Sequence, residues 1–410
     1  MGLIIGILMF MGLVLIHELW HFIAAKRSWV KVLEFGIWIP PKICKLRTDK
    51  SGTEYTLNLI PLWWFVRLKG EDPKHEEEFN AKDSFIKANI FNKFLILIAW
   101  VTANFLAARV IFTFVFTAGT KPISMISENM FDTQIESYLM PTKSFLYNQW
   151  LISEEQKKEI ENIPVKVFET MPWWLWEQMG IQSWDIIKSI NSVSINAWNI
   201  EQILKNNIWW NISLYYTRNW ISYQTEWICE AESCLLGIVF SYSGFSKEDL
   251  TNLDDDLIKF PFIKSAWIAL KEIKAQSKLT FYALGNLWKN LVSFDKTKIS
   301  WALNKLSWPV WAVKFGDMLL EAGWWKQFLA FAGLISLALA LFNVLPIPAL
   351  DWWRLLGVLI QWIGRLKAEK YFTIEWFINL FFFVILMWLG IYIILKDLVR
   401  FWWVKIPFIG

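Results

Sequence analysis

Four long apolar runs determine what this chain can fold into. They cover about Leu3–Ala25, Ile90–Ala118, Phe328–Leu345 and Thr373–Leu395. Each is long enough for a helix to cross a hydrocarbon layer roughly 30 Å thick. Hydrophobic residues make up 55% of the chain, charged residues 19%, and the mean hydropathy is +0.34, which excludes an ordinary soluble protein. We therefore expect a mainly α-helical membrane protein with four transmembrane helices.

Positive charge is concentrated in two of the connections between these runs and at the start of the second run. The residues concerned are Lys26, Arg27, Lys31, Lys87, Lys93, Arg354, Arg365, Lys367 and Lys370. Because loops rich in lysine and arginine stay in the cytoplasm, residues 119–326 are expected outside, in a multi-pass protein of the inner (plasma) membrane. The first run has no basic stretch before it and no small-residue cleavage site, so we expect it to be retained as a spanning helix.

Two histidines and a glutamate interrupt the first apolar run, as His17-Glu18-Leu19-Trp20-His21. This HExxH spacing places both imidazoles on one face of a helix, where they can bind one Zn²⁺. Glu18 lies beside them and can take a proton from an activated water. The motif alone is weak, but ionisable residues in a membrane helix are costly and usually functional. The sequence therefore predicts a catalytic zinc site within the membrane.

A catalytic zinc usually has a third protein ligand, for which Asp351 is the strongest candidate. It closes the stretch from Asn343 to Asp351, in which Pro346 and Pro348 prevent a regular helix. Irregular backbone at membrane depth is tolerated where it lines protein or a cavity. Asn343 is either a substrate contact or a hydrogen-bonding residue between helices. Both motifs fall at the cytoplasmic ends of their helices, so we expect them to meet.

These motifs resemble those of the site-2 proteases, which are intramembrane zinc metalloproteases of the bacterial regulated-intramembrane-proteolysis type. The resemblance covers nearly the whole chain. Residues 61–66 look like the family's membrane-associated β-hairpin, and residues 99–104 look like its second-span motif. Residues 179–191 are similar to the core of a single PDZ domain, and residues 306–310 resemble the segment before the third span.

The resemblance implies a role for each candidate residue. His17, His21 and Asp351 would bind Zn²⁺, Glu18 would be the general base and later the acid for the leaving amine, and Asn343 would help to hold the substrate. The substrate would be a transmembrane protein in the lipid bilayer, of the anti-sigma factor or remnant signal peptide type. Its helix must unwind before cleavage, and adding it as a strand to an exposed hairpin edge would achieve this.

The sequence divides into four expected regions. Residues 1–118 hold the first two transmembrane helices, HExxH and an intervening β-hairpin loop, and residues 119–249 hold an extramembrane PDZ-like α+β domain at about 165–237. Residues 250–326 look amphipathic and helical, and residues 327–410 hold the last two transmembrane helices.

Extended segments are expected inside two of these regions. The hairpin loop predicts strands at 54–60, at 65–68 and at 32–43, the last ended by Pro40-Pro41, in a small antiparallel sheet. The PDZ-like region predicts strands at 185–190 and 212–216, and a helix is expected at 154–162.

Two other functions compete with proteolysis. A catalytically inactive scaffold could bind membrane proteins through the PDZ-like domain, but it would not need Glu18. A metal transporter would need more ionisable groups over more spans. The net charge of +4 comes without a basic stripe, so no nucleic-acid partner is expected, and three cysteines give no disulfide framework.

Tryptophan is unusually frequent, with 30 residues against 18 glycines. Glycine is normally about 7% of residues. Six tryptophan doublets occur, and Trp184 lies where a tight turn favours glycine. The family has a small residue at the position of Trp20 and Asp-Gly-Gly in place of Asp351-Trp352-Trp353. Because UGA encodes glycine in certain bacterial lineages and tryptophan in others, we predict that most of these positions are glycine in the living cell. Enrichment of tryptophan at membrane interfaces is the alternative.

Overall fold

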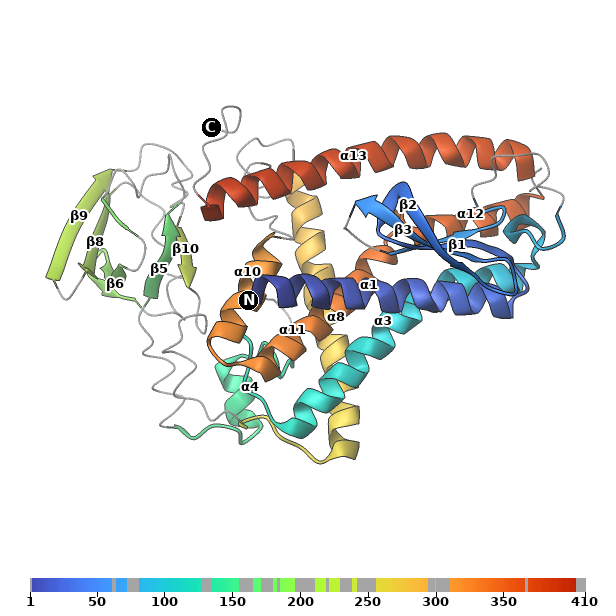
Figure 1. Ribbon diagram of the computed structural model, residues 1–410. Coiled ribbons are helices and arrows are strands. Elements are labelled where there is room, and N and C mark those ends of the chain that lie inside the picture. Colours follow the sequence, from blue (N-terminus) through green and yellow to red (C-terminus); the bar gives the residue numbers. More distant parts are fainter. Residues whose placement is uncertain are drawn as a thin grey trace. The chain divides into compact units, whose positions relative to one another are not determined.

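The computed structural model describes residues 2–402 with several gaps. The residues left out between these ends are 61–63, 72–80, 125, 127–134, 155–164, 171–179, 183–184, 196–210, 219–220, 229–237, 242–255, 294–298, 300–309 and 366–367. The chain forms two compact units (Figure 1). One consists of Met1–Phe112 with Ser277–Gly410, and the other is Thr113–Gln276.

Among the residues that the structure describes, four helices are long and apolar enough to cross a membrane, which confirms the four predicted spans. They are α1 (Gly2–Arg27), α3 (Ile90–Ala118), α11 (Trp325–Asn343) and α13 (Ala368–Trp402). The other helices in the described ranges are the short η1 (Phe85–Lys87), α4 (Lys143–Asn148), α8 (Phe262–Leu291), α10 (Val310–Glu321) and α12 (Asp351–Gly364). The irregular stretch with Pro346 and Pro348 separates α11 from α12, as proline geometry requires.

The loop between α1 and α3 forms a four-stranded sheet in the order β2-β3-β1-β4. Its strands are β1 (Val32–Ile37), β2 (Ile39–Thr48), β3 (Glu54–Ile60) and β4 (Phe65–Leu68). The predicted strands at 54–60 and 65–68 are confirmed. The expected purely antiparallel pairing is wrong, because β1 and β3 run parallel. The expected stop at Pro40-Pro41 is also wrong: β2 contains both prolines, which an edge strand tolerates because one side has no pairing partner.

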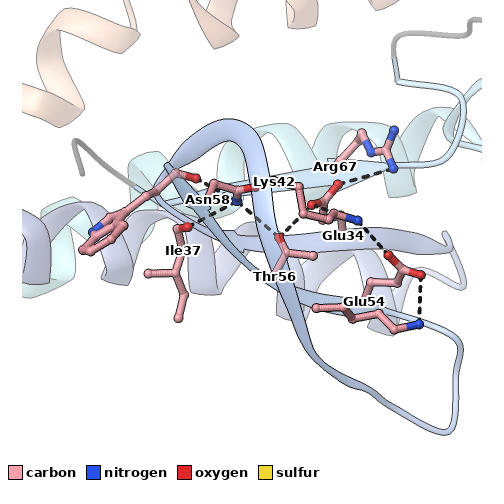
Figure 2. Close-up of polar contacts among 9 residues, drawn as sticks. Glu34, Ile37, Lys42, Glu54, Thr56, Asn58 and Arg67 are labelled. Atoms are coloured by element: carbon pink, nitrogen blue, oxygen red, sulfur yellow. Dashed lines mark hydrogen bonds and ion pairs between the residues drawn. The ribbon is translucent and has the colours of Figure 1, made fainter. Parts of the chain in front are cut away.

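Polar side chains, both buried and exposed, join the strands of this sheet (Figure 2). The Glu34 carboxylate accepts a hydrogen bond from Thr56 Oγ1 at 2.7 Å. Lys42 and Arg67 approach the same carboxylate, at 3.8 and 3.4 Å. Asn58 Nδ2 on β3 donates to the carbonyls of residues 37 and 38, at 3.2 and 3.1 Å. These contacts tie three neighbouring strands to one another, and Arg67 adds the fourth.

One hydrophobic cluster joins the sheet to the helices around it. It brings together the end of α1, the start of α3 and the middle of α12 with β1 and β4. Its buried members are Ala25, Val30, Val32, Leu68, Phe85, Ile96, Leu97, Leu355 and Val358. Burying this surface holds α12 against the end of α1, one turn beyond the HExxH motif.

The second unit contains a sheet in the order β10-β5-β6-β8-β9, with β7 paired to β6. Its strands are β5 (Val165–Thr170), β6 (Ile186–Ile190), β7 (Val193–Ser194), β8 (Asn211–Arg218), β9 (Ile221–Ile228) and β10 (Ile238–Ser241). The predicted strands at 185–190 and 212–216 are confirmed within a residue or two of their ends. The predicted helix at 154–162 and the motif at 306–310 fall almost entirely outside the described residues.

A buried carboxylate anchors α8 in the second unit. Glu272 is fully buried and accepts hydrogen bonds from Ser137 Oγ and from the backbone N–H of Tyr138, both at 2.7 Å. Burial raises the pKa of this carboxyl group above its usual range. The α8 helix, expected from sequence as part of an amphipathic segment, is therefore fixed to the chain that follows α3 by a specific polar contact.

Candidate metal centre

Helix α1 presents both histidines of HExxH together, one turn apart. The imidazole centroids of His17 and His21 lie 5.5 Å apart. Glu18 Oε1 lies 3.9 Å from Nε2 of His17. The His21 residue is 8% exposed, and the His17 and Glu18 side chains are only 13% and 17% exposed. The arrangement has two nitrogen donors on one helix face, with a carboxylate beside them, as metal-dependent hydrolysis requires.

Helix α3 closes one side of this site. Trp100 is fully buried, and its ring centroid lies 4.5 Å from that of His17 and 6.1 Å from that of His21. One turn further on, Asn104 Nδ2 lies 3.3 Å from Nδ1 of His17. The Asn104 carbonyl accepts a hydrogen bond from Ser336 Oγ of α11 at 3.0 Å, which places a third spanning helix next to the site.

Asn104 is a candidate site residue that the sequence pattern identified only as part of the span motif at 99–104. The sequence signal was an asparagine in an apolar span, since such a residue needs a hydrogen-bond partner. In the structure Asn104 is fully buried. In the described part of the chain, its Oδ1 is buried without a hydrogen-bond partner. Turning the amide by half a rotation would let Oδ1 accept from Nδ1–H of His17. That tautomer leaves the Nε2 lone pair for a metal, as in most histidine–metal sites.

Asp351 is the first residue of α12, and Leu355 of this helix lies in one hydrophobic cluster with Ala25 of α1. Trp352 packs on the cluster that contains Ala25 of α1. Arg354, one turn into α12, is close enough to His21 for an electrostatic interaction. Arg354 also pairs with Glu71, with Nη1 and Oε1 2.5 Å apart.

The described residues do not include the Asp351 side chain. Among those that are described, no three histidine, cysteine, aspartate or glutamate side chains are grouped so that they could hold a metal. The role of Asp351 as third ligand therefore stays a prediction. The two histidine rings nevertheless provide the nitrogen donors that zinc prefers. The Asn104 amide can hold one of these rings in the orientation that a metal ligand needs.

Asn343 is the last residue of α11, and the chain beyond it turns beside α3. Val344 packs against the buried cluster of Trp100, Val101 and Ala340. Further along, the backbone N–H of Ala349 donates to Asn379 Oδ1 of α13 at 3.1 Å. The irregular stretch between α11 and α12 thus contacts α3 and α13. A substrate contact by Asn343 stays a prediction.

Replacing Asn104 should weaken zinc binding without abolishing it. Asn104→Ala removes the group that orients the His17 ring, so we expect zinc affinity to fall roughly 10- to 100-fold. Competition with a chelator of known affinity measures the change. Thr102→Ala is the matched control, because Thr102 is exposed on the same helix and donates to the Ile98 carbonyl. Equal affinities for the two variants would contradict a role for Asn104.

The amino-acid sequence of this chain is similar to those of known proteins over most of its length. The sequence profile described as Peptidase family M50 matches residues 5–386. A protein of Oceanobacillus iheyensis named zinc metalloprotease RasP is 27% identical over 451 aligned residues, covering 96% of this chain and 98% of its own. A protein of the same name from Shouchella clausii is 22% identical, covering 85% and 88%. A protein of Clostridium acetobutylicum is 26% identical over 404 residues, covering 97% of each chain.

Proposed function

We propose, from the premise that this chain belongs to peptidase family M50 and is a zinc metalloprotease of the membrane, that it hydrolyses peptide bonds within or near transmembrane segments of other membrane proteins. The observation that carries the proposal is the position of the HExxH residues. They lie on α1, a helix that can cross a membrane, and Asn104 of a second such helix contacts His17. A substrate that reaches these residues has to be in the bilayer as well.

The proposed mechanism assigns one task to each residue. His17, His21 and Asp351 would hold the zinc ion, and Asn104 would orient the His17 ring. When bound, zinc polarises the scissile carbonyl and makes a water molecule more acidic. Glu18 takes the proton from the attacking water and then gives it to the leaving amine. Asn343, at the end of α11, holds the substrate backbone near the site. A catalytically inactive scaffold would have no use for the proton transfer by Glu18.

The sheet between α1 and α3 offers a way to hold the substrate extended. Peptide groups in a helix are hydrogen-bonded to one another, so the protease has to unwind a segment of the substrate helix before water can attack it. Strand β2 lies at an edge of the sheet, and most of its residues are exposed. Pairing of the substrate with such an edge would replace the lost helical hydrogen bonds. This edge belongs to the hairpin that β2 forms with β3.

The second unit would select substrates rather than perform chemistry. We assign a PDZ-like role to residues 165–237, whose described part forms most of the sheet. Such a domain would filter substrates of the anti-sigma factor or remnant signal peptide type by their size or by their terminus. Regulated intramembrane proteolysis would follow from that selection.

The direct test is cleavage by purified protein. The zinc-loaded protein in detergent or liposomes should cut a model single-span substrate inside its membrane segment, and mass spectrometry of the products locates the bond. Loss of cleavage on treatment with a chelator, with recovery on adding zinc, ties the activity to the metal. A zinc-loaded protein that binds single-span substrates without cutting them would instead support the scaffold.

The zinc site is expected in the cytoplasmic half of the inner membrane, with residues 119–326 outside. The lysine and arginine distribution favours this orientation. Cysteine labelling in intact cells tests it, with His75→Cys and Leu250→Cys introduced after Cys44, Cys229 and Cys234 are replaced by serine. An impermeant reagent should label position 250 and not position 75. The opposite pattern would reverse the orientation.

A further inference from the structure

In the described part of the chain, three tryptophans have backbone conformations that suit glycine. Trp29, Trp38 and Trp150 have φ values of 59°, 69° and 58°. Side chains with a Cβ rarely adopt this left-handed region, because the Cβ approaches the neighbouring carbonyl oxygen. Glycine has no such penalty. Position 38 is the single residue between β1 and β2, where the chain bends from one strand into the next.

Trp29 occupies the first position after the cap of α1. Its N–H donates to the Lys26 carbonyl at 3.3 Å, and the N–H of Val30 donates to the Ala25 carbonyl at 3.0 Å. These two bonds define the Schellman motif, in which the left-handed residue is usually glycine. The Trp29 side chain is 87% exposed, so packing of the indole does not compensate for the backbone conformation.

Trp150 occupies the same position after α4. Its N–H donates to the Tyr147 carbonyl at 2.9 Å, and the N–H of Leu151 donates to the Leu146 carbonyl at 3.0 Å. The side chain is 91% exposed. Two unrelated helices thus end in one motif with an exposed tryptophan at the position that favours glycine.

Helix α10 provides an internal standard. Its end has the same two bonds, from Gly323 to the Leu320 carbonyl at 3.0 Å and from Trp324 to the Leu319 carbonyl at 2.8 Å. Here the left-handed residue is Gly323, with φ of 76°. The same hydrogen-bond motif therefore has glycine at the left-handed position after α10 and tryptophan at that position after α1 and α4.

Buried tryptophans give an independent indication. In the described part of the chain, the indole Nε1 atoms of Trp38, Trp64, Trp100 and Trp353 are buried without a hydrogen-bond partner. A buried indole N–H normally has an acceptor, because leaving it unpaired is costly. Trp38 has both a left-handed backbone conformation and a buried indole N–H without a partner.

We infer that positions 29, 38, 100 and 150 carry glycine in the protein that its own cell makes, through UGA codons read as glycine. At position 100 the consequence is functional and rests on the proposed protease activity. The indole there stacks beside both imidazoles of HExxH. Glycine would remove it and leave a space on α3 next to the zinc ligands. An unwound substrate strand and the attacking water need such a space beside the metal.

The decisive measurement is the mass of peptides from the native protein, purified from its own cells. Each peptide that covers position 29, 38, 100 or 150 should have a mass below the value calculated with tryptophan. The difference should equal the mass difference between a tryptophan and a glycine residue. The codons at these positions should be UGA. Tryptophan at positions 29 and 150 overturns the inference, and tryptophan at position 100 alone overturns its active-site part.

Recombinant variants separate the backbone effect from the loss of bulk. Trp29→Gly and Trp150→Gly should each raise the melting temperature relative to the recombinant protein that carries tryptophan at these positions. Trp29→Ala and Trp150→Ala should raise the melting temperature less, or lower it. Gly323→Trp should lower it. Equal changes in melting temperature for the glycine and alanine variants would show that the left-handed backbone conformation does not affect stability. That result would overturn the inference at these helix ends.

Trp100→Gly tests the active-site consequence. Cleavage of a single-span substrate should increase roughly 100-fold, while zinc content stays the same or rises. Trp100→Phe, which keeps an aromatic ring, is the matched control and should not increase cleavage. Glycine in the native peptide together with a zinc-loaded variant that never cleaves would retain the inference at position 100 and reject the proposed protease. Cleavage by Trp100→Phe equal to that by Trp100→Gly would overturn the claim that the space is needed.

Discussion

Glu18→Gln should retain zinc and lose cleavage by roughly 10²- to 10⁴-fold, the usual contribution of a general acid–base residue. Glutamine has nearly the same size and shape, but it cannot take a proton from water at neutral pH. Glu18 is assigned no bond to the metal, so the ion should remain on the histidines. The measurement is the rate of cleavage of a single-span substrate, together with zinc content per mole of protein.

Glu226→Gln is the control for this experiment. Glu226 is an exposed carboxylate on β9 of the second unit, so its replacement should leave both the rate and the zinc content unchanged. Full activity of Glu18→Gln would remove Glu18 from the mechanism. Loss of zinc together with activity would instead make Glu18 part of the metal site or of its folding.

His17→Ala, His21→Ala and Asp351→Ala should each lose most of the bound zinc and all measurable cleavage. A catalytic zinc site with three protein ligands retains little affinity after one is removed. Metal analysis of the purified proteins measures the loss, and circular dichroism shows whether the helices persist. Because α1 and α12 are held by the cluster around Ala25 and Leu355, the fold should survive these replacements.

His75→Ala is the matched control, since His75 is the third of the three histidines in the chain and lies far from the motif in sequence. It should keep normal zinc content and activity. An Asp351→Ala protein that keeps its zinc and its activity would exclude Asp351 from the site. Such a result would leave His17 and His21 in need of another third ligand.

The sequence alone predicted the features that arise from local constraints. A long apolar run in lipid has to be helical, so the four spans could be placed closely from composition. The i, i+4 spacing of His17 and His21 follows from the helix repeat, and the structure has both rings on the same side of α1. The strands at 54–60 and 65–68 were likewise readable from their residue types and flanking turns.

Tertiary structure decided the features that depend on contacts between distant residues. The parallel pairing of β1 with β3, and the placement of β2 at an edge that tolerates two prolines, follow from the order of strands in the sheet. Asn104 meets His17 across 87 positions of the chain, and the Trp100 ring lies beside both imidazoles. Periodicity and residue type are properties of one segment, whereas a helix-to-helix contact depends on how two segments pack. For that reason the sequence pattern was enough to identify the two histidines and the glutamate. Only the packing of α3 on α1 showed that Asn104 contacts His17 and that Trp100 occupies the space beside both histidines.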